Sequence, residues 1–268
     1  MRTNIHHSPN GIPPSVTSIG SGAFAGCLGI PQIVIPPGVL QIGSSAFSNC
    51  ASLSNVTISP NVGDISDFAF QGCSGITSIT IPANVQHLGI MAFRNCGSLA
   101  SAYFMGASPY MEVSVFDNAA PEFTVYYFSG FSGFSSPLWR GYPAVGMGDK
   151  TLEKIWLIDH EQPHDSSLIA DSDGDGVSLL LAYALGLDPR NNLSGSLPKP
   201  IIASGQIHLD FFAATPGVTY RVESSTNLNN WTTQGVTTST LDANHLRASA
   251  NRSGSSLYLR IAVSTGGP

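Results

Sequence analysis

Apolar and polar positions recur with a period of 23 residues through the first half of the chain. A phenylalanine returns at every step, and a cysteine three residues later keeps the same interval. These residues are Phe24, Phe47, Phe70, Phe93 and Phe116, with Cys27, Cys50, Cys73 and Cys96. A spacing that does not drift places every unit at the same point of a coil. The pattern therefore predicts a solenoid over roughly the first half of the chain.

Within each unit, a short alternation of apolar and polar residues predicts one β-strand. Leu53–Ile58 has apolar residues at its first, fourth and sixth positions, which is the strand signature of a leucine-rich repeat. Alternation with period two indicates a strand with one buried face. Stacked coils would align these strands as a parallel sheet. The small-residue stretch Gly22–Cys27 predicts a tight helical turn on the opposite wall.

The outward positions of the predicted sheet form a candidate binding face. They combine tyrosines with small hydroxyl and amide side chains, a mixture that favours contact with a protein or a glycan. The alternative is that Tyr103 and Tyr126 only cover the terminal coils. The face comprises Gln32, Val34, Asn55, Thr57, Ser78, Thr80, Ser101, Tyr103, Thr124 and Tyr126.

Units such as Ile81–Cys96 resemble the BspA-type leucine-rich repeat of bacterial surface proteins, and the resemblance extends from residue 12 to about residue 127. It implies a role in adhesion. The last unit departs from the pattern, because Ala119 replaces the cysteine and Glu122 the leucine. Trp139 still falls on the phenylalanine ladder. Residues 106–148 resemble the closing segment of such arrays, where atypical residues cover the open end of the core.

The composition favours an extracellular protein. Charged residues make up 10% of the chain, compared with about 25% in typical soluble domains. The net charge of −6, with no basic patch, argues against nucleic acid as a partner. No stretch approaches the roughly 20 apolar residues of a membrane-spanning helix. We expect a secreted or cell-surface monomer. The chain shows no signal peptide and enters its first unit at Ile12, which indicates an N-terminally truncated chain.

The four equivalent cysteines allow two interpretations. Neighbouring coils would hold their Cα atoms about 5 Å apart, within reach of a disulfide. The other interpretation is a ladder of small buried thiols that fills one layer of the core, and this is the one we expect. His87 lies in a polar turn of the predicted solenoid, and we expect it to be solvated.

Three carboxylates at alternate positions follow the repeats, in the loop Asp-Ser-Asp-Gly-Asp-Gly-Val. Asp171, Asp173 and Asp175 can converge on one hard cation, Gly176 permits a sharp turn, and Val177 would add a backbone carbonyl. With the apolar helix predicted to follow it, this loop resembles the calcium loop of dockerin-like and thrombospondin-repeat-like segments. The resemblance implies calcium as a structural cofactor.

One ligand of such a loop is missing. Position 12, where a bidentate carboxylate is expected, falls on Ala182. Water, a carbonyl, or a carboxylate from Asp165 or Asp188 would have to complete the site, and the affinity would be low. The alternative is a solvated acidic turn that caps the following helix through its dipole.

The remaining segments predict a helical linker and a small β-domain. Thr151–Ile158 and Val177–Leu187 have helical patterns, and period-two runs begin at about residue 198. The segment Tyr220–Trp231 resembles the carboxy-terminal β-domain of secreted bacterial proteins, and we expect Trp231 to anchor its core rather than to bind a ligand.

The fold class expected is therefore a β-rich α/β chain in three parts. A leucine-rich-repeat solenoid with a parallel sheet occupies residues 1–148. A short helical linker with the acidic loop occupies residues 149–197, and a small antiparallel β-sandwich occupies residues 198–268.

The sequence contains no motif of an enzyme active site that we can identify. It has no Gly-Xaa-Ser-Xaa-Gly elbow, phosphate loop or His-Glu-Xaa-Xaa-His motif. His160 and His164 lie four residues apart beside Asp165, but Pro163 interrupts the helix that would align them. We expect a non-enzymatic binding or adhesion protein. The alternative is a structural spacer of a larger extracellular protein, with a junction stabilised by calcium.

Overall fold

The structure is a computed structural model that describes residues 12–251 and 256–265. The chain divides into two compact units, one ending at Lys150 and the other beginning at Thr151. Residues 1–7, on which the expectation about a signal peptide rests, lie outside the described residues.

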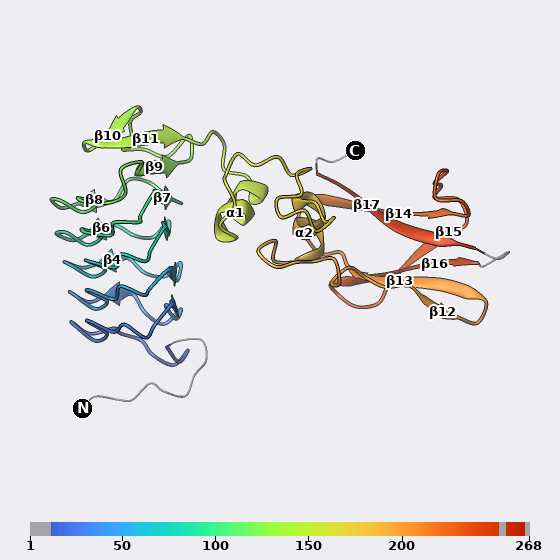
Figure 1. The fold of residues 1–268 in the computed structure, drawn as a ribbon, viewed down its shortest axis with the longest axis horizontal. Coiled ribbons are helices and arrows are strands. Elements are labelled where there is room, and N and C mark those ends of the chain that lie inside the picture. Colours follow the sequence, from blue (N-terminus) through green and yellow to red (C-terminus); the bar gives the residue numbers. More distant parts are fainter. Residues whose placement is uncertain (1–11, 252–255, 266–268) are drawn as a thin grey trace. The chain divides into compact units, whose positions relative to one another are not determined.

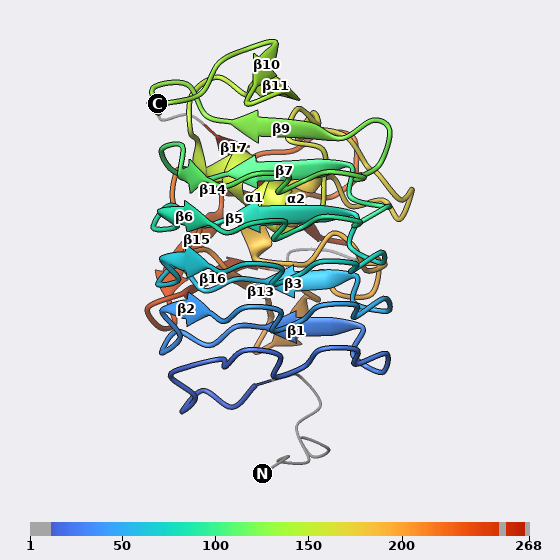
Figure 2. The same ribbon diagram turned by 90° about the vertical axis from the view of Figure 1, so that its left-hand side faces the viewer.

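The first unit is a solenoid of stacked coils whose strands form a parallel wall (Figures 1 and 2). Strands in this wall pair in parallel, and Thr80, Tyr103 and Tyr126 are direct partners across it, which is the predicted step of 23 residues. The wall is divided between the second and third strands, so that it consists of two sheets. Its strands are β1 (Gln32–Val34), β3 (Asn55–Thr57), β5 (Ser78–Ile81), β7 (Ser101–Phe104) and β9 (Thr124–Tyr127).

A second parallel sheet, which the sequence pattern did not predict, runs along the solenoid. Each of its strands has two residues, of which the second is buried and the first faces outward. The four strands are β2 (Gln41–Ile42), β4 (Asp64–Ile65), β6 (His87–Leu88) and β8 (Tyr110–Met111), hydrogen-bonded in that order.

The stretch predicted as a helical turn forms tight turns instead. The N–H groups of Phe47 and Phe70 donate to the carbonyls of Ala69 and Ala92 in the next coil, both at 2.8 Å. Backbone groups that bond between coils cannot also bond four residues back along the chain, as an α-helix requires. The turns therefore join the coils as the sheets do.

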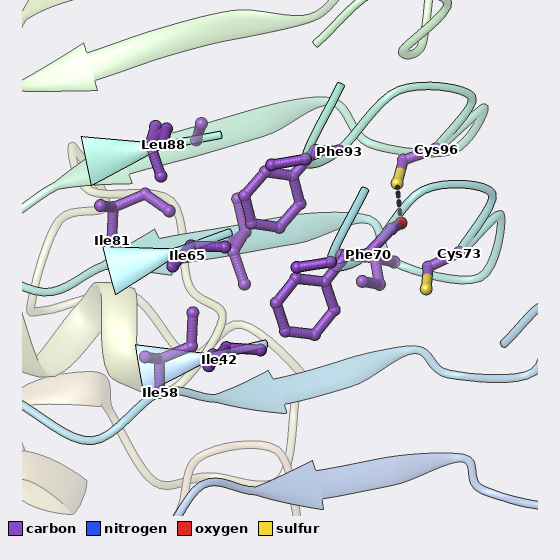
Figure 3. Packing of buried hydrophobic residues seen from close by; sticks show 14 of the residues in the cluster. Ile42, Ile58, Ile65, Phe70, Cys73, Ile81, Leu88, Phe93 and Cys96 are labelled. Atoms are coloured by element: carbon purple, nitrogen blue, oxygen red, sulfur yellow. Dashed lines mark hydrogen bonds between the residues drawn. The ribbon is translucent and has the colours of Figure 1, made fainter. Parts of the chain in front are cut away.

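The phenylalanine ladder forms the centre of the core. Phe47, Phe70 and Phe93 are fully buried, and their rings stack with centroids 5.1 and 5.2 Å apart. The four cysteines are free thiols, as expected, and the three buried ones each donate a hydrogen bond to a carbonyl of the preceding coil. Figure 3 shows the bond from Cys96 Sγ to the carbonyl of Phe70, which measures 3.2 Å.

The end of the solenoid differs from the prediction at Trp139. β11 (Tyr142–Gly146) adds to β9 in parallel, and β10 (Leu138–Trp139) folds back on β11. The indole of Trp139 packs against Phe104 on the sheet side of the core, with centroids 5.2 Å apart, and not against Phe116. Tyr142 instead meets the Phe116 ring edge-on at 5.6 Å. The repeat spacing does not hold here because the chain reverses into β11 before completing a coil.

The second unit begins with two short helices, close to those predicted. α1 (Leu152–Asp159) starts at the N-cap Thr151, whose side chain accepts a hydrogen bond from the Lys154 N–H. α2 (Leu179–Leu185) has Ser178 as its N-cap and ends at Gly186 in the left-handed conformation, which glycine adopts without strain.

Antiparallel strands complete the second unit. The larger sheet has the order β12 (Ile201–Ala203), β13 (Gln206–Phe212), β16 (His245–Asn251) and β15 (Val236–Thr240). The smaller one pairs β14 (Val218–Ser225) with β17 (Tyr258–Thr265). Apolar residues from both sheets and from α2 form one cluster around Leu209, Phe211 and Val222.

Candidate functional site

The ten residues of the predicted binding face lie on β1, β3, β5, β7 and β9, the strands that form the large wall of the solenoid. The pairing places Gln32 beside Asn55 and Val34 beside Thr57. Farther along, Ser78, Ser101 and Thr124 form one row, and Thr80, Tyr103 and Tyr126 form the next. They alternate with buried core residues, so these side chains lie on one surface.

The two tyrosines of this face form a pair. The rings of Tyr103 and Tyr126 stack with centroids 5.0 Å apart and planes 19° apart, and both side chains are half-buried. Stacking restricts their rotamers, so they present a fixed aromatic surface beside the small hydroxyl groups of Ser101 and Thr124. This geometry is compatible both with ligand contact and with cover for the end of the wall.

The acidic loop brings its three carboxylates together. Ligand-type oxygen atoms of Asp171, Asp173 and Asp175 all lie within 4.8 Å of one another. Asp171 accepts hydrogen bonds from the N–H groups of Gly174 at 2.9 Å and Gly176 at 2.8 Å. Backbone donors therefore orient the first carboxylate toward the inside of the loop.

Asp175 joins the loop to the rest of the second unit. Its carboxylate accepts from the Val177 N–H at 2.8 Å and also from the Leu193 N–H. Ala182, at position 12, is fully buried and offers no side-chain ligand. Asp188 is engaged by Arg190 at 2.7 Å. Among the described residues, the acidic cluster contains neither Asp188 nor Asp165.

A polar row on the second parallel sheet of the solenoid, which consists of β2, β4, β6 and β8 and is called the small sheet below, escaped the sequence analysis. His87 is half-buried rather than solvated, with its Nδ1 atom 2.7 Å from Asp64 Oδ2 and its Nε2 atom 3.9 Å from Glu112 Oε1. The ring of Tyr110 stacks on His87 at 5.9 Å. Residues 41, 64, 87 and 110 are 23 apart and precede the buried ladder by one position, which is the signal that could have revealed this row.

Burial and hydrogen bonding act in opposite directions on the carboxyl group of Asp64. Burial opposes ionisation of Asp64, but the hydrogen bonds from Ser66, Gln41 and His87 outweigh it and hold the pKa of Asp64 below its usual value. The Gln41 side-chain amide donates at 2.9 Å and the Ser66 hydroxyl at 2.6 Å.

Trp231 does not have the core position expected for it. It is half-buried, and the guanidinium carbon of Arg260 lies 4.4 Å from its ring centroid. Arg260 also pairs with the buried Glu223 at 2.7 Å. The core cluster around Phe211 and Val222 does not include Trp231.

The comparisons with known proteins agree with the solenoid. Residues 7–121 match the BspA type leucine-rich repeat region in six copies. This match covers the repeats of the solenoid and supports their assignment as leucine-rich repeats of the BspA type. No curated protein matches the chain. The matched residues end before the dockerin-like loop and the C-terminal β-domain, so the assignments of these two segments stay predictions.

Solved leucine-rich repeat structures resemble parts of the chain. A leucine-rich cell surface protein of Faecalibacterium prausnitzii is 26% identical, with a TM-score of 0.42, over 50% of this chain and 34% of its own. The leucine-rich repeat protein of T. pallidum is 24% identical, with a TM-score of 0.40, over 43% of this chain and 56% of its own. A leucine-rich repeat protein from Bacteroides capillosus is 33% identical, with a TM-score of 0.32, over 38% of this chain and 75% of its own. The chain thus spans between a third and three-fifths of the first two structures.

Within the described part of the chain, neither helix has the length and apolar character needed to cross a bilayer. The candidate functional features of the chain are the polar rows of the solenoid and the acidic loop of the second unit.

Proposed function

We propose that this protein is a non-enzymatic binding protein of the bacterial surface or exterior, and that the large wall of its solenoid contacts a protein or a glycan. The observation that supports the proposal is the in-register face of hydroxyl and amide groups beside the Tyr103–Tyr126 pair. Rigid aromatic groups beside small polar ones form contacts at low entropic cost. The BspA-type repeat supports an adhesion role.

Binding of the labelled full chain to a glycan array and to purified extracellular-matrix proteins tests this proposal. Thr57→Arg introduces a long cation into the exposed centre of the face. Ser52→Arg introduces the same cation into an exposed turn between strands and serves as the matched control. We expect Thr57→Arg to weaken binding at least tenfold and Ser52→Arg to leave it unchanged. Equal affinities for the two variants would refute the role of the face.

We further propose that the acidic loop holds a calcium ion as a structural cofactor. The donor set supports this, because Ca²⁺ takes six to eight oxygen ligands and three converging carboxylates supply part of that number. The carbonyl of Val177 and water would supply more. With Ala182 in place of the last carboxylate, we expect a dissociation constant of about 10⁻⁴ to 10⁻³ M.

Thermal unfolding with millimolar calcium and with a chelator tests the calcium site. Mass action predicts a rise of about 1–2 kcal/mol in the stability of the second unit at tenfold excess of calcium over the dissociation constant. Asp173→Ala should abolish this rise, while Asp165→Ala, outside the cluster, should retain it. Identical melting curves with calcium and with chelator would refute the calcium site and indicate that the three aspartates only form a turn that caps the following helix. A calcium ion in this loop would also support the alternative function, in which the protein is a structural spacer of a larger extracellular protein and calcium stabilises a junction.

A further inference from the structure

A hollow of about 520 Å³ opens on the small sheet at the C-terminal end of the solenoid. Its polar and aromatic lining comes from the last coil and from the cap that follows β10. The groups that matter are Tyr110, Glu112, Ser114, Asp117, Arg140 and Tyr142. Figure 1 shows β8 as the last strand of the small sheet, with β10 and β11 beyond it.

The hollow exists because the repeat stops there. In the preceding coil, the N–H groups of Met91, Phe93 and Asn95 donate to carbonyls of the next coil. One coil later, the Phe116 N–H donates to the hydroxyl of Tyr142 at 3.2 Å. The Ser114 N–H has no backbone acceptor among the described residues. The cap thus replaces only part of the missing coil.

The aromatic group at the mouth of this hollow is held in place. Tyr110 is 62% exposed, yet its ring stacks on that of His87 with planes 17° apart. His87 is in turn fixed by Asp64 at 2.7 Å. An exposed ring that is already ordered loses little entropy when a ligand packs against it.

The polar groups of the hollow are also held and carry both signs of charge. The Tyr142 hydroxyl donates to Asp117 at 2.9 Å. Hydrogen bonds from Ser114 and Tyr142, together with the nearby charge of Arg94, keep the pKa of Asp117 below its usual value. Glu112 adds a second carboxylate and Arg140 a guanidinium. Two carboxylates beside one guanidinium disfavour an anion, and this mixture of acceptors and donors suits the hydroxyl groups of a neutral ligand.

We propose that this hollow binds a neutral oligosaccharide, with Tyr110 packing on a sugar ring and Glu112 and Arg140 bonding its hydroxyl groups. Its volume lies within the roughly 300–1,000 Å³ of small-molecule sites. An extended peptide is the less favoured occupant. The open edge of β8 is only two residues long and offers few backbone hydrogen bonds for strand addition. This site is separate from the large wall and does not depend on the function proposed for that wall.

Saturation-transfer NMR on the full chain with cellobiose, maltose, lactose and chitobiose tests the proposal. We expect at least one disaccharide to bind, Tyr110→Ala to weaken that binding at least tenfold, and Glu112→Gln to weaken it severalfold. Tyr258→Ala removes a tyrosine that is 40% exposed in the second unit and should change nothing. Ser52→Arg, in an exposed turn outside both the large wall and the hollow, should also leave disaccharide binding intact.

Two results would overturn the inference. One is the absence of saturation transfer from every disaccharide, and the other is unchanged transfer in Tyr110→Ala. If a pool of random hexapeptides shifts the Tyr110 resonances and no sugar does, the hollow is a peptide site. Melting curves of Tyr110→Ala and Glu112→Gln show whether the fold is retained. We expect that it is, because neither residue is buried.

Discussion

Phe70→Ala tests whether the stacked rings are the main source of stability in the solenoid. The Phe70 side chain is fully buried and stacks on Phe47 at 5.1 Å and on Phe93 at 5.2 Å. Truncation of a buried phenylalanine to alanine costs about 3–5 kcal/mol, through lost burial and the cavity left behind. Phe24 occupies the same position in the first described coil, but it is half-buried and, among the described residues, stacks on Phe47 alone. Phe24→Ala is therefore the matched control.

The two substitutions should differ in cost because they remove different numbers of stacked rings. Phe70→Ala removes two ring pairs and Phe24→Ala one, and each pair contributes about 0.5–1.5 kcal/mol beyond burial. We expect losses of about 4 kcal/mol for Phe70→Ala and about 2 kcal/mol for Phe24→Ala. In a solenoid, stability is approximately the sum of repeat terms and nearest-neighbour interfaces, so a substitution in a central coil should cost more than one in a terminal coil.

Urea unfolding of the full chain measures both losses. In a background with Trp156→Phe and Trp231→Phe, tryptophan fluorescence reports only on Trp139 in the solenoid. Circular dichroism follows the same transition independently. The urea concentration at the midpoint of unfolding should fall, while the slope of the unfolding free energy against urea concentration stays constant, as expected when stability alone changes. Equal losses for the two variants would refute the argument, because burial and stacking would then not set the energy of the ladder.

Three further predictions concern the solenoid. A thiol reagent should modify Cys27 rapidly in the native protein, because Cys27 is half-exposed. Cys96 should react slowly, because burial raises the pKa of its thiol to about 12. Fast reaction of more than one thiol would contradict the buried ladder of Cys50, Cys73 and Cys96. Gly89→Ala should lower the unfolding free energy by about 1–3 kcal/mol, since the new Cβ would overlap the backbone of Asp67. The control Gly97→Ala should be neutral, because a Cβ added at Gly97 points into open space. Equal denaturation midpoints for the two variants would refute this prediction. The lowered pKa of Asp64 stabilises the fold above the unfolded pKa of about 4, and this contribution disappears as the pH falls through the folded pKa. The deficit of Asp64→Asn in thermal melts should therefore be largest near neutral pH and shrink in acid, and a constant deficit would exclude the effect.

Much of the solenoid could be predicted because its repeat is a local pattern that neighbouring coils reinforce. The strand positions Ile79, Ala102 and Val125 lie in register with the predicted step. The two-residue strands of the small sheet were missed, since a pair such as His87–Leu88 is too short to show alternation. The cap was misjudged at Trp139, because a spacing argument assumes that the chain completes another coil.

The acidic loop shows a second limit of sequence reasoning. The spacing of Asp171, Asp173 and Asp175 predicts convergence, and the structure has it. The bond from the Leu193 N–H to Asp175 links residues 18 apart, and no local pattern indicates it. Such contacts depend on how the chain folds back on itself, so they emerge only with the three-dimensional structure.

The repeat also explains where ligand groups can gather in this protein. Inside the stack, each coil satisfies the backbone donors of its neighbour, and the buried ladder tolerates only apolar side chains and thiols. Specific polar groups can therefore vary only on the outward rows, or where the repeat ends and donors lose their partners. Asp64 and His87 occupy such a row, and Ser114 and Tyr142 occupy such an end. The distribution of charge agrees with this. Between residues 11 and 105 the acidic and basic side chains are Asp64, Asp67 and Arg94, whereas Glu112, Asp117 and Arg140 all lie beside the last coil.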